Sequence, residues 1–154
     1  MSTRSMIGKV EAGGRVRAVY CHWGGTPDSA GGTLANYWAD PGKVDQLLEM
    51  GSLSHLGQEI GEWHDPADFS KVDQWSTFHG RDMGRGGPDY EAVEFATDRD
   101  YMDYARAIDC RYVYLWTAGG WRYAALPWGP WAGVPADMGG VEWVSLTAAL
   151  QDGA

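Results

Sequence analysis

The alternation of apolar and polar positions near the N-terminus predicts a β-hairpin. Residues 4–10 and 15–23 are expected to form its strands, and the glycines of residues 11–14 supply the positive φ angles that a short loop needs. Alternate side chains of the second strand lie on opposite faces. One face carries Val16, Ala18, Tyr20 and His22, and the other carries Val19, Cys21 and Trp23. Because the last half of this strand is apolar on both faces, we expect it to lie inside the sheet.

Two short helices are expected after a Gly-Gly-Thr-Pro corner at residues 24–27. The apolar stripe of the first consists of Leu34, Tyr37 and Trp38. The second has clearer boundaries, because Asp40 is a good N-cap, Pro41 suits the first helical position and Gly51 is a natural stop. Its apolar stripe consists of Val44, Leu47 and Leu48. Trp23, Leu34, Tyr37 and Leu47 are therefore expected to fill a core.

The second half of the chain has a similar mixture of elements. Further strands are predicted at residues 91–96, 111–116, 121–126 and 141–146, the middle two forming a second hairpin. Thr97 followed by Asp100 resembles a capping box and predicts a helix. Its inward side chains are expected to be Tyr101, Tyr104, Ala105 and Ile108. A short helical tail is predicted at residues 147–151.

Together these elements predict one α+β domain over residues 1–154. We expect a mostly antiparallel sheet of about five strands, built from two hairpins, with about three short helices covering one face. Residues 57–90 differ from the rest, since they are rich in Gly and Pro and poor in apolar side chains. A loop this long is uncommon, so this region is either a functional insertion or loop-rich structure pinned by its aromatic rings.

The chain is acidic, with 21 Asp and Glu against 12 Lys and Arg and a net charge of −9. This charge disfavours direct binding to nucleic acid or to anionic membranes. Negative side chains gather in residues 89–109, where the candidates for contact with a partner are Asp89, Glu91, Glu94, Asp98, Asp100 and Asp103. This segment is either a solvated helix face or a surface that docks on a basic partner protein.

The two cysteines and four histidines have no familiar catalytic or metal-binding spacing. Cys21 and His22 are adjacent, but neighbouring residues of a strand point to opposite faces, so we expect Cys21 in the core and no catalytic dyad. We predict no metal or cofactor; the places where a metal would bind are His64 with Asp65 and His79 with Asp82. No apolar segment resembles a signal peptide or membrane span, so a cytosolic protein with reduced thiols is expected.

Two segments are candidates for binding a ligand. Residues 80–87 form a Gly-rich loop whose backbone amides and arginines could hold a phosphate. With the 20–27 corner, this loop predicts a pocket built from Arg4, His22, Arg81 and Arg85. Trp128 and Trp131 lie beside Gly and Pro, and are either an exposed stacking surface or rings folded into the core.

Residues 3–57 also carry a specific set of motifs. They begin with Thr-Arg-Ser, pass through Tyr20-Cys21-His22-Trp23 and Pro27, and end with Gly-Ser-Leu-Ser-His-Leu-Gly at 51–57. In these motifs the chain resembles a widespread group of small bacteriophage and prophage proteins with a Tyr-Cys-His-Trp-Asp-Gly-Tyr-Pro corner. Gly24 and Thr26 depart from it, standing where the group usually has Asp and Tyr. The resemblance covers about a third of the chain and implies an accessory phage-type protein of the bacterial host cytoplasm, without naming a reaction.

Three hypotheses about function follow. The leading one is a non-enzymatic protein that binds a host or phage protein and modulates a host factor, counter-defence being one such role. The second is a small-ligand-binding protein or enzyme that uses the 20–27 corner and the 80–87 loop. The third is a Trp-based carbohydrate or virion-surface module at Trp128 and Trp131. The residues select no oligomeric state.

Overall fold

The two predicted hairpins form the middle of the sheet. β1 (Ser5–Val10) pairs antiparallel with β2 (Val16–Cys21), and β6 (Tyr112–Thr117) pairs antiparallel with β7 (Gly120–Ala125). In the computed structural model, which describes residues 3–127 and 138–152, β1 and β6 run parallel and join the hairpins into one sheet. Both predicted hairpins are confirmed.

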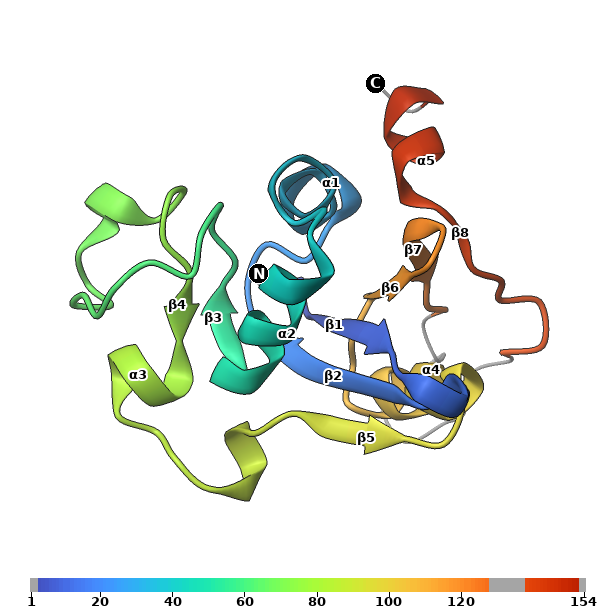
Figure 1. Ribbon diagram of the computed structural model, residues 1–154, viewed down its shortest axis with the longest axis horizontal. Helices are drawn as coiled ribbons and strands as arrows, with labels where there is room; N and C mark the ends of the chain where they lie inside the picture. Colours follow the sequence, from blue (N-terminus) through green and yellow to red (C-terminus); the bar gives the residue numbers. More distant parts are fainter. Residues whose placement is uncertain (1–2, 128–137, 153–154) are drawn as a thin grey trace.

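Shorter strands extend this sheet on both sides. β3 (Leu53–His55) runs parallel to the end of β2, and β4 (Thr77–Phe78) pairs antiparallel with β3. β5 (Val93–Phe95) pairs with the start of β2, and β8 (Val144–Ser145) pairs with β7. Figure 1 shows β3 and β4 at one end of the molecule and β7 and β8 at the other.

The α+β class is confirmed, but the expected sheet was too small and too uniform. The described residues form eight strands, and the β1–β6 and β2–β3 pairings are parallel. The missed strands β3 and β4 have only three and two residues, which is too few to show an alternating pattern. The expected strand over 141–146 is correct only at β8, because α5 begins at Leu146.

Helices cover both faces of the sheet rather than one. The α-helices are α1 (Gly32–Tyr37), α2 (Pro41–Met50), α3 (His79–Met83), α4 (Asp98–Ala107) and α5 (Leu146–Asp152). Single turns of other helix types are η1 (Ala12–Gly14), η2 (Pro27–Gly31), η3 (Phe69–Lys71) and η4 (Pro88–Tyr90). The predicted caps are confirmed: the Asp40 carboxylate accepts from Gly42 N at 2.9 Å, and the Thr97 hydroxyl accepts from Asp100 N at 3.1 Å. None of the described helices is both long and apolar enough to cross a membrane.

The alternation of β1 and β2 divides the core into two layers. Ile7 and Val19 face α1, α2 and α5, where the buried side chains include Leu34, Trp38, Leu47 and Leu146. Met6 and Ala18 face α4, and the other buried side chains of this layer include Tyr101, Met102, Ala105 and Val113. Three aromatic side chains expected in the core are instead exposed: Trp23 by 48%, Tyr37 by 45% and Tyr104 by 40%.

Residues 57–90 are pinned by a buried polar cluster as well as by rings. We call Arg81, Asp82, His64 and Thr77 the Arg81 cluster. The Arg81 guanidinium contacts Asp82 at 2.9 Å and donates to the carbonyl oxygens of Ile60, Gly61 and Ser76. His64 Nε2 lies 3.0 Å from Thr77 Oγ1, and Asp82 accepts from Phe78 N at 2.8 Å. Arg81 thus ties the start of this region to its later turns.

Candidate functional site

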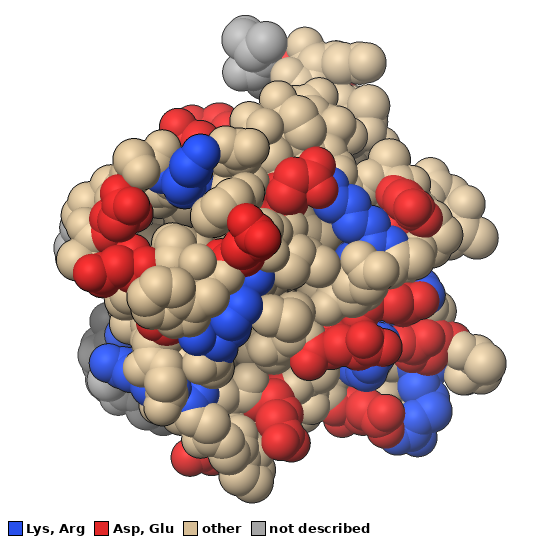
Figure 2. All heavy atoms as spheres, turned by 60° about the vertical axis from the view of Figure 1, so that its left-hand side comes forward, with Lys and Arg blue, Asp and Glu red and all other residues tan. Residues whose placement is uncertain are grey.

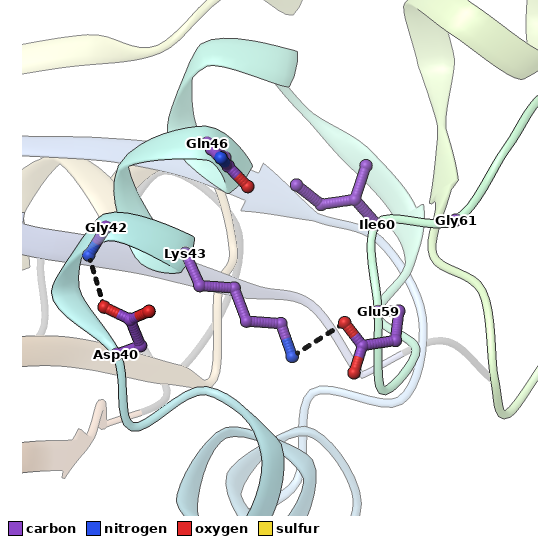
Figure 3. Close-up of a pocket in the computed structure, with 7 residues that line it drawn as sticks. All are labelled: Asp40, Gly42, Lys43, Gln46, Glu59, Ile60 and Gly61. Carbon is purple, nitrogen blue, oxygen red and sulfur yellow. Dashed lines mark hydrogen bonds and ion pairs between the residues drawn. The ribbon is translucent and has the colours of Figure 1, made fainter.

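Two hollows stand out among the described residues, and the larger of these two is part of the scaffold. It has a volume of about 460 Å³ and is lined by Asp40, Gly42, Lys43, Gln46, Glu59, Ile60 and Gly61. Figure 3 shows Lys43 reaching across it to Glu59, at 3.1 Å. The Lys43 ammonium also donates to the Tyr37 and Gln58 carbonyl oxygens and lies 4.3 Å from the Trp38 ring centre. Because its ammonium has these internal partners, Lys43 fastens α2 to the following loop and is poorly placed to bind a ligand.

The smaller hollow has a different character. Its volume is about 350 Å³, and it is lined by Tyr20, His22, His79, Arg85, Asp89, Tyr90, Tyr104 and Ile108. We call it the histidine pocket. Its residues come from the end of β2, from α3 and the loop after it, from η4, and from the end of α4. Pockets of this size accept small molecules.

Strand alternation places the first two pocket residues. The side chains of Tyr20 and Ala18 lie on the α4 face of β2, and Tyr20 packs against the core layer under α4. His22 directly follows the strand and continues the same alternation, so it joins Tyr20 at the pocket. Tyr104 and Ile108 of the predicted α4 stripe extend past the closed core and line the same hollow.

Backbone hydrogen bonds to Ser52 place the opposite wall. Ser52 N donates to the Tyr90 carbonyl oxygen at 2.9 Å, and His79 N donates to the Ser52 carbonyl oxygen at 3.1 Å. Gly51 makes this approach possible, because its φ is +84° and a Cβ there would overlap the Tyr90 carbonyl oxygen. The His79 and Tyr90 rings then lie 5.5 Å apart between centres.

The ring of His22 is anchored by one nitrogen. Its Nδ1 lies 2.7 Å from the Tyr20 hydroxyl. Burial raises the pKa of Tyr20 to about 12, so the phenol keeps its proton and can either donate to Nδ1 or accept from an Nδ1–H. In the tautomer in which the phenol donates, the neutral imidazole of His22 carries its own proton on Nε2. Burial, and then the positive charge of Arg4, lowers the pKa of His22, which keeps the ring neutral at pH 7.

His79 is anchored in the same manner. Its Nδ1 lies 2.9 Å from the Ser52 hydroxyl, and the residue is buried. Burial lowers the pKa of His79, and the charges of Arg85 and His22 lower it further. Within residues 3–127 and 138–152, neither His22 nor His79 has a hydrogen-bond partner at Nε2.

Two arginines near these rings have no carboxylate partner in the described part of the chain. Arg85 lines the pocket, and Arg4 lies close enough to lower the pKa values of His22 and Tyr20. By contrast, Arg15 and Arg17 are each paired with an acidic side chain. Of these two arginines Arg85 lines the pocket, and in a protein with a net charge of −9 an arginine there without a carboxylate partner is available to an external anion.

The structure brings together some of the residues expected to bind a ligand and separates others. His22 and Arg85 line one pocket with Arg4 close by, as the 20–27 corner and 80–87 loop suggested. Arg81 does not join them, since its guanidinium belongs to the Arg81 cluster. Cys21 is fully buried in the opposite core layer, and burial raises its pKa to about 12, so it is not paired with His22 as a nucleophile.

The acidic residues expected to meet a partner have varied surroundings. Asp89 lines the histidine pocket, Glu94 pairs with Arg15 at 3.5 Å, and Asp98 accepts from Trp143 Nε1 at 3.0 Å. The remaining three, Glu91, Asp100 and Asp103, are exposed. Figure 2 shows acidic and basic side chains interspersed over the face that it presents. Trp128 and Trp131 lie outside the described residues.

Several pocket residues were not foreseen as ligand-binding residues. Tyr20 and Tyr104 were assigned to strand and helix faces, Tyr90 carried no motif, and Ser52, which anchors His79, was noted only as part of the 51–57 motif. His79 was considered only beside Asp82, whose carboxylate pairs with Arg81. The described residues contain no cluster of three or more His, Cys, Asp or Glu side chains that could hold a metal ion.

Comparison of the chain with protein-family models, with curated proteins and with solved structures finds no match. The resemblance to bacteriophage and prophage proteins therefore stays a prediction.

Proposed function

We propose that this protein binds a small anionic ligand in the histidine pocket. The observation that carries the proposal is the combination of two anchored imidazoles with two arginines, Arg4 and Arg85, that have no carboxylate partner among the described residues. A ligand that accepts at Nε2 of His22 selects the tautomer in which Nδ1 accepts from the Tyr20 hydroxyl, and the guanidinium groups supply positive charge. The backbone around Ser52, His79 and Tyr90 and the two imidazole rings are held by internal hydrogen bonds, so this part of the site is preorganised for the ligand.

A thermal-shift measurement with and without inorganic phosphate or sulfate, at low ionic strength, tests this proposal. Binding stabilises the folded state, and in a chain of this size each kcal/mol raises the Tm by about 2–4 °C. We expect Arg85→Gln to abolish the shift. Arg122→Gln is the matched control, because Arg122 is an exposed residue of β7 outside the pocket. Equal shifts in both variants would contradict the proposal.

The hypothesis of a macromolecular partner stays a separate prediction. Glu91, Asp100 and Asp103 are exposed and would be available to a basic protein surface, whereas Glu94 and Asp98 already have internal partners. Affinity purification from a bacterial lysate, comparing the native chain with a triple Glu91→Gln, Asp100→Asn, Asp103→Asn variant, tests that hypothesis. Recovery of the same proteins by both forms would count against the acidic segment as a surface that docks on a basic partner protein. Phage origin and a place in the host cytoplasm likewise stay predictions.

A further inference from the structure

We infer that the histidine pocket selects a phosphate ester that carries a flat aromatic ring, the class to which nucleoside monophosphates belong. This inference rests on the proposed function and names the ligand class for the same pocket. It follows from the two kinds of surface that line the pocket, hydrogen-bonding groups and apolar rings.

The donors suit a phosphate group. His22 with its Nε2 atom and Arg85 line the pocket, and Arg4 lies near it; the three groups come from different parts of the chain. A phosphate monoester has three terminal oxygens and can accept from all of them, whereas a carboxylate has two. The Nδ1 atoms are already occupied by Tyr20 and Ser52, so both rings keep Nε2 for a ligand.

The apolar wall suits a flat ring. Tyr90 packs on His79, and Tyr104 packs on Phe95 with 5.2 Å between ring centres. Tyr104 remains 40% exposed although it belongs to the apolar stripe of α4, and Ile108 from the same stripe also lines the pocket. This apolar surface is left open by the core and lies beside the donors. Stacking of a base on an aromatic side chain is a general way of recognising nucleotides.

Asp89 gives the pocket an acceptor as well. Its carboxylate is exposed at the pocket and would repel a phosphate placed against it. An amino or hydroxyl group of the ligand is its natural partner, since a carboxylate only accepts hydrogen bonds at neutral pH. AMP offers both groups: hydroxyls on its ribose, and an amino group on its base at the end away from the phosphate.

Calorimetric titration with AMP, adenosine and inorganic phosphate separates these contributions. We expect AMP to bind at least tenfold more tightly than adenosine or phosphate. Tyr104→Ala should weaken AMP binding by about tenfold, the size of one lost stacking contact, and leave phosphate binding unchanged. The control is Tyr37→Ala, which removes an equally exposed tyrosine from α1 on the other face of the sheet.

The outcomes distinguish this inference from the proposed function. If phosphate binds as tightly as AMP, and Arg85→Gln removes both, the ligand class is wrong while the anion site stands. If AMP binding is equally weakened by Tyr104→Ala and Tyr37→Ala, the ring wall is in the wrong place. If neither phosphate nor AMP binds, both the inference and the proposed function fail.

Discussion

The Arg81 cluster and the histidine pocket are built from the same kinds of side chain and use them in opposite ways. Each contains an arginine, a histidine and an aspartate from the 57–90 region: Arg81, His64 and Asp82 in one, Arg85, His79 and Asp89 in the other. In the Arg81 cluster both ring nitrogens of His64 have partners, Glu62 O at 2.8 Å and Thr77 Oγ1 at 3.0 Å. In the histidine pocket only the Nδ1 atom of His79 is used.

This difference teaches how a polar group that stabilises the fold can be told from one that is left for a ligand. Residue type and sequence neighbourhood do not separate Arg81 from Arg85, which lie four residues apart in the same Gly-rich segment. Their partners do, because Arg81 donates to three carbonyl oxygens and a buried carboxylate. The distinction can be tested by changing one region and using the other as its control.

The largest expected effect is on stability, from the Arg81 cluster. Arg81→Met should lower the free energy of unfolding by about 3–5 kcal/mol, because it leaves the fully buried Asp82 carboxylate without its cation. Arg85→Met should change it by about 0.5 kcal/mol or less, since Arg85 is exposed. Urea unfolding of both variants measures this difference. The double variant Arg81→Met, Asp82→Asn should recover part of the lost free energy of unfolding. A loss of equal size in Arg85→Met would show that the two arginines do not differ in their contribution to stability.

A second expected effect links stability to the shape of the pocket. Gly51→Ala should cost about 2 kcal/mol or more, because the position needs a positive φ and a Cβ would overlap the Tyr90 carbonyl oxygen. The same change displaces Tyr90 and should therefore weaken phosphate or AMP binding. Gly86→Ala is the matched control, since nothing lies within 4 Å of a Cβ there. Thermal unfolding and calorimetric titration check the two consequences, and unchanged binding in a folded Gly51→Ala protein would show that Tyr90 does not shape the site.

Local features of this fold could be predicted from the sequence because their causes are local. The helix starts at Asp40 and Thr97 depend on side chains that accept from amides two or three residues away. The separation of Cys21 from His22 depends only on strand alternation. The same rule placed Tyr20 and His22 on one face, and the Gly-rich 80–87 loop pointed to Arg85 as a further residue of the site.

The rest of the site depends on contacts between distant segments. Tyr90 reaches the pocket because its carbonyl oxygen accepts from Ser52 N, 38 positions earlier in the sequence. The two segments can come this close because residue 51 is a glycine and has no Cβ. Ser52 directly precedes β3 and His79 directly follows β4, and both strands are too short to show periodicity in the sequence. Trp23, Tyr37 and Tyr104 were expected inside because a ring at a periodic position is usually buried, but they are 48%, 45% and 40% exposed.

The smallest expected effect is a pH dependence that separates the pocket from the scaffold. Burial lowers the pKa values of His22, His79 and His55 in the folded state, whereas in the unfolded chain they titrate near about 6.5. Between the lowered values and about 6.5 the unfolded chain binds more protons, so stability is full above this window and is lost as the pH falls through it. A bound anion favours the protonated imidazoles of the pocket and should reduce this loss. Urea unfolding between pH 5.5 and 7.5, with and without phosphate, measures both slopes.

The variants of this experiment decide which histidines are responsible. His55 lies outside the pocket, so in His55→Gln phosphate should still flatten the slope. In the double variant His22→Gln, His79→Gln only the His55 part of the slope should remain, and phosphate should leave it unchanged. The pH range stays above the region where carboxylates titrate, so the 21 acidic residues contribute little. If phosphate flattened the slope of the double variant as much as that of the native chain, the two imidazoles of the pocket would not face the anion. The histidine pocket would then differ from the Arg81 cluster only in being exposed to solvent.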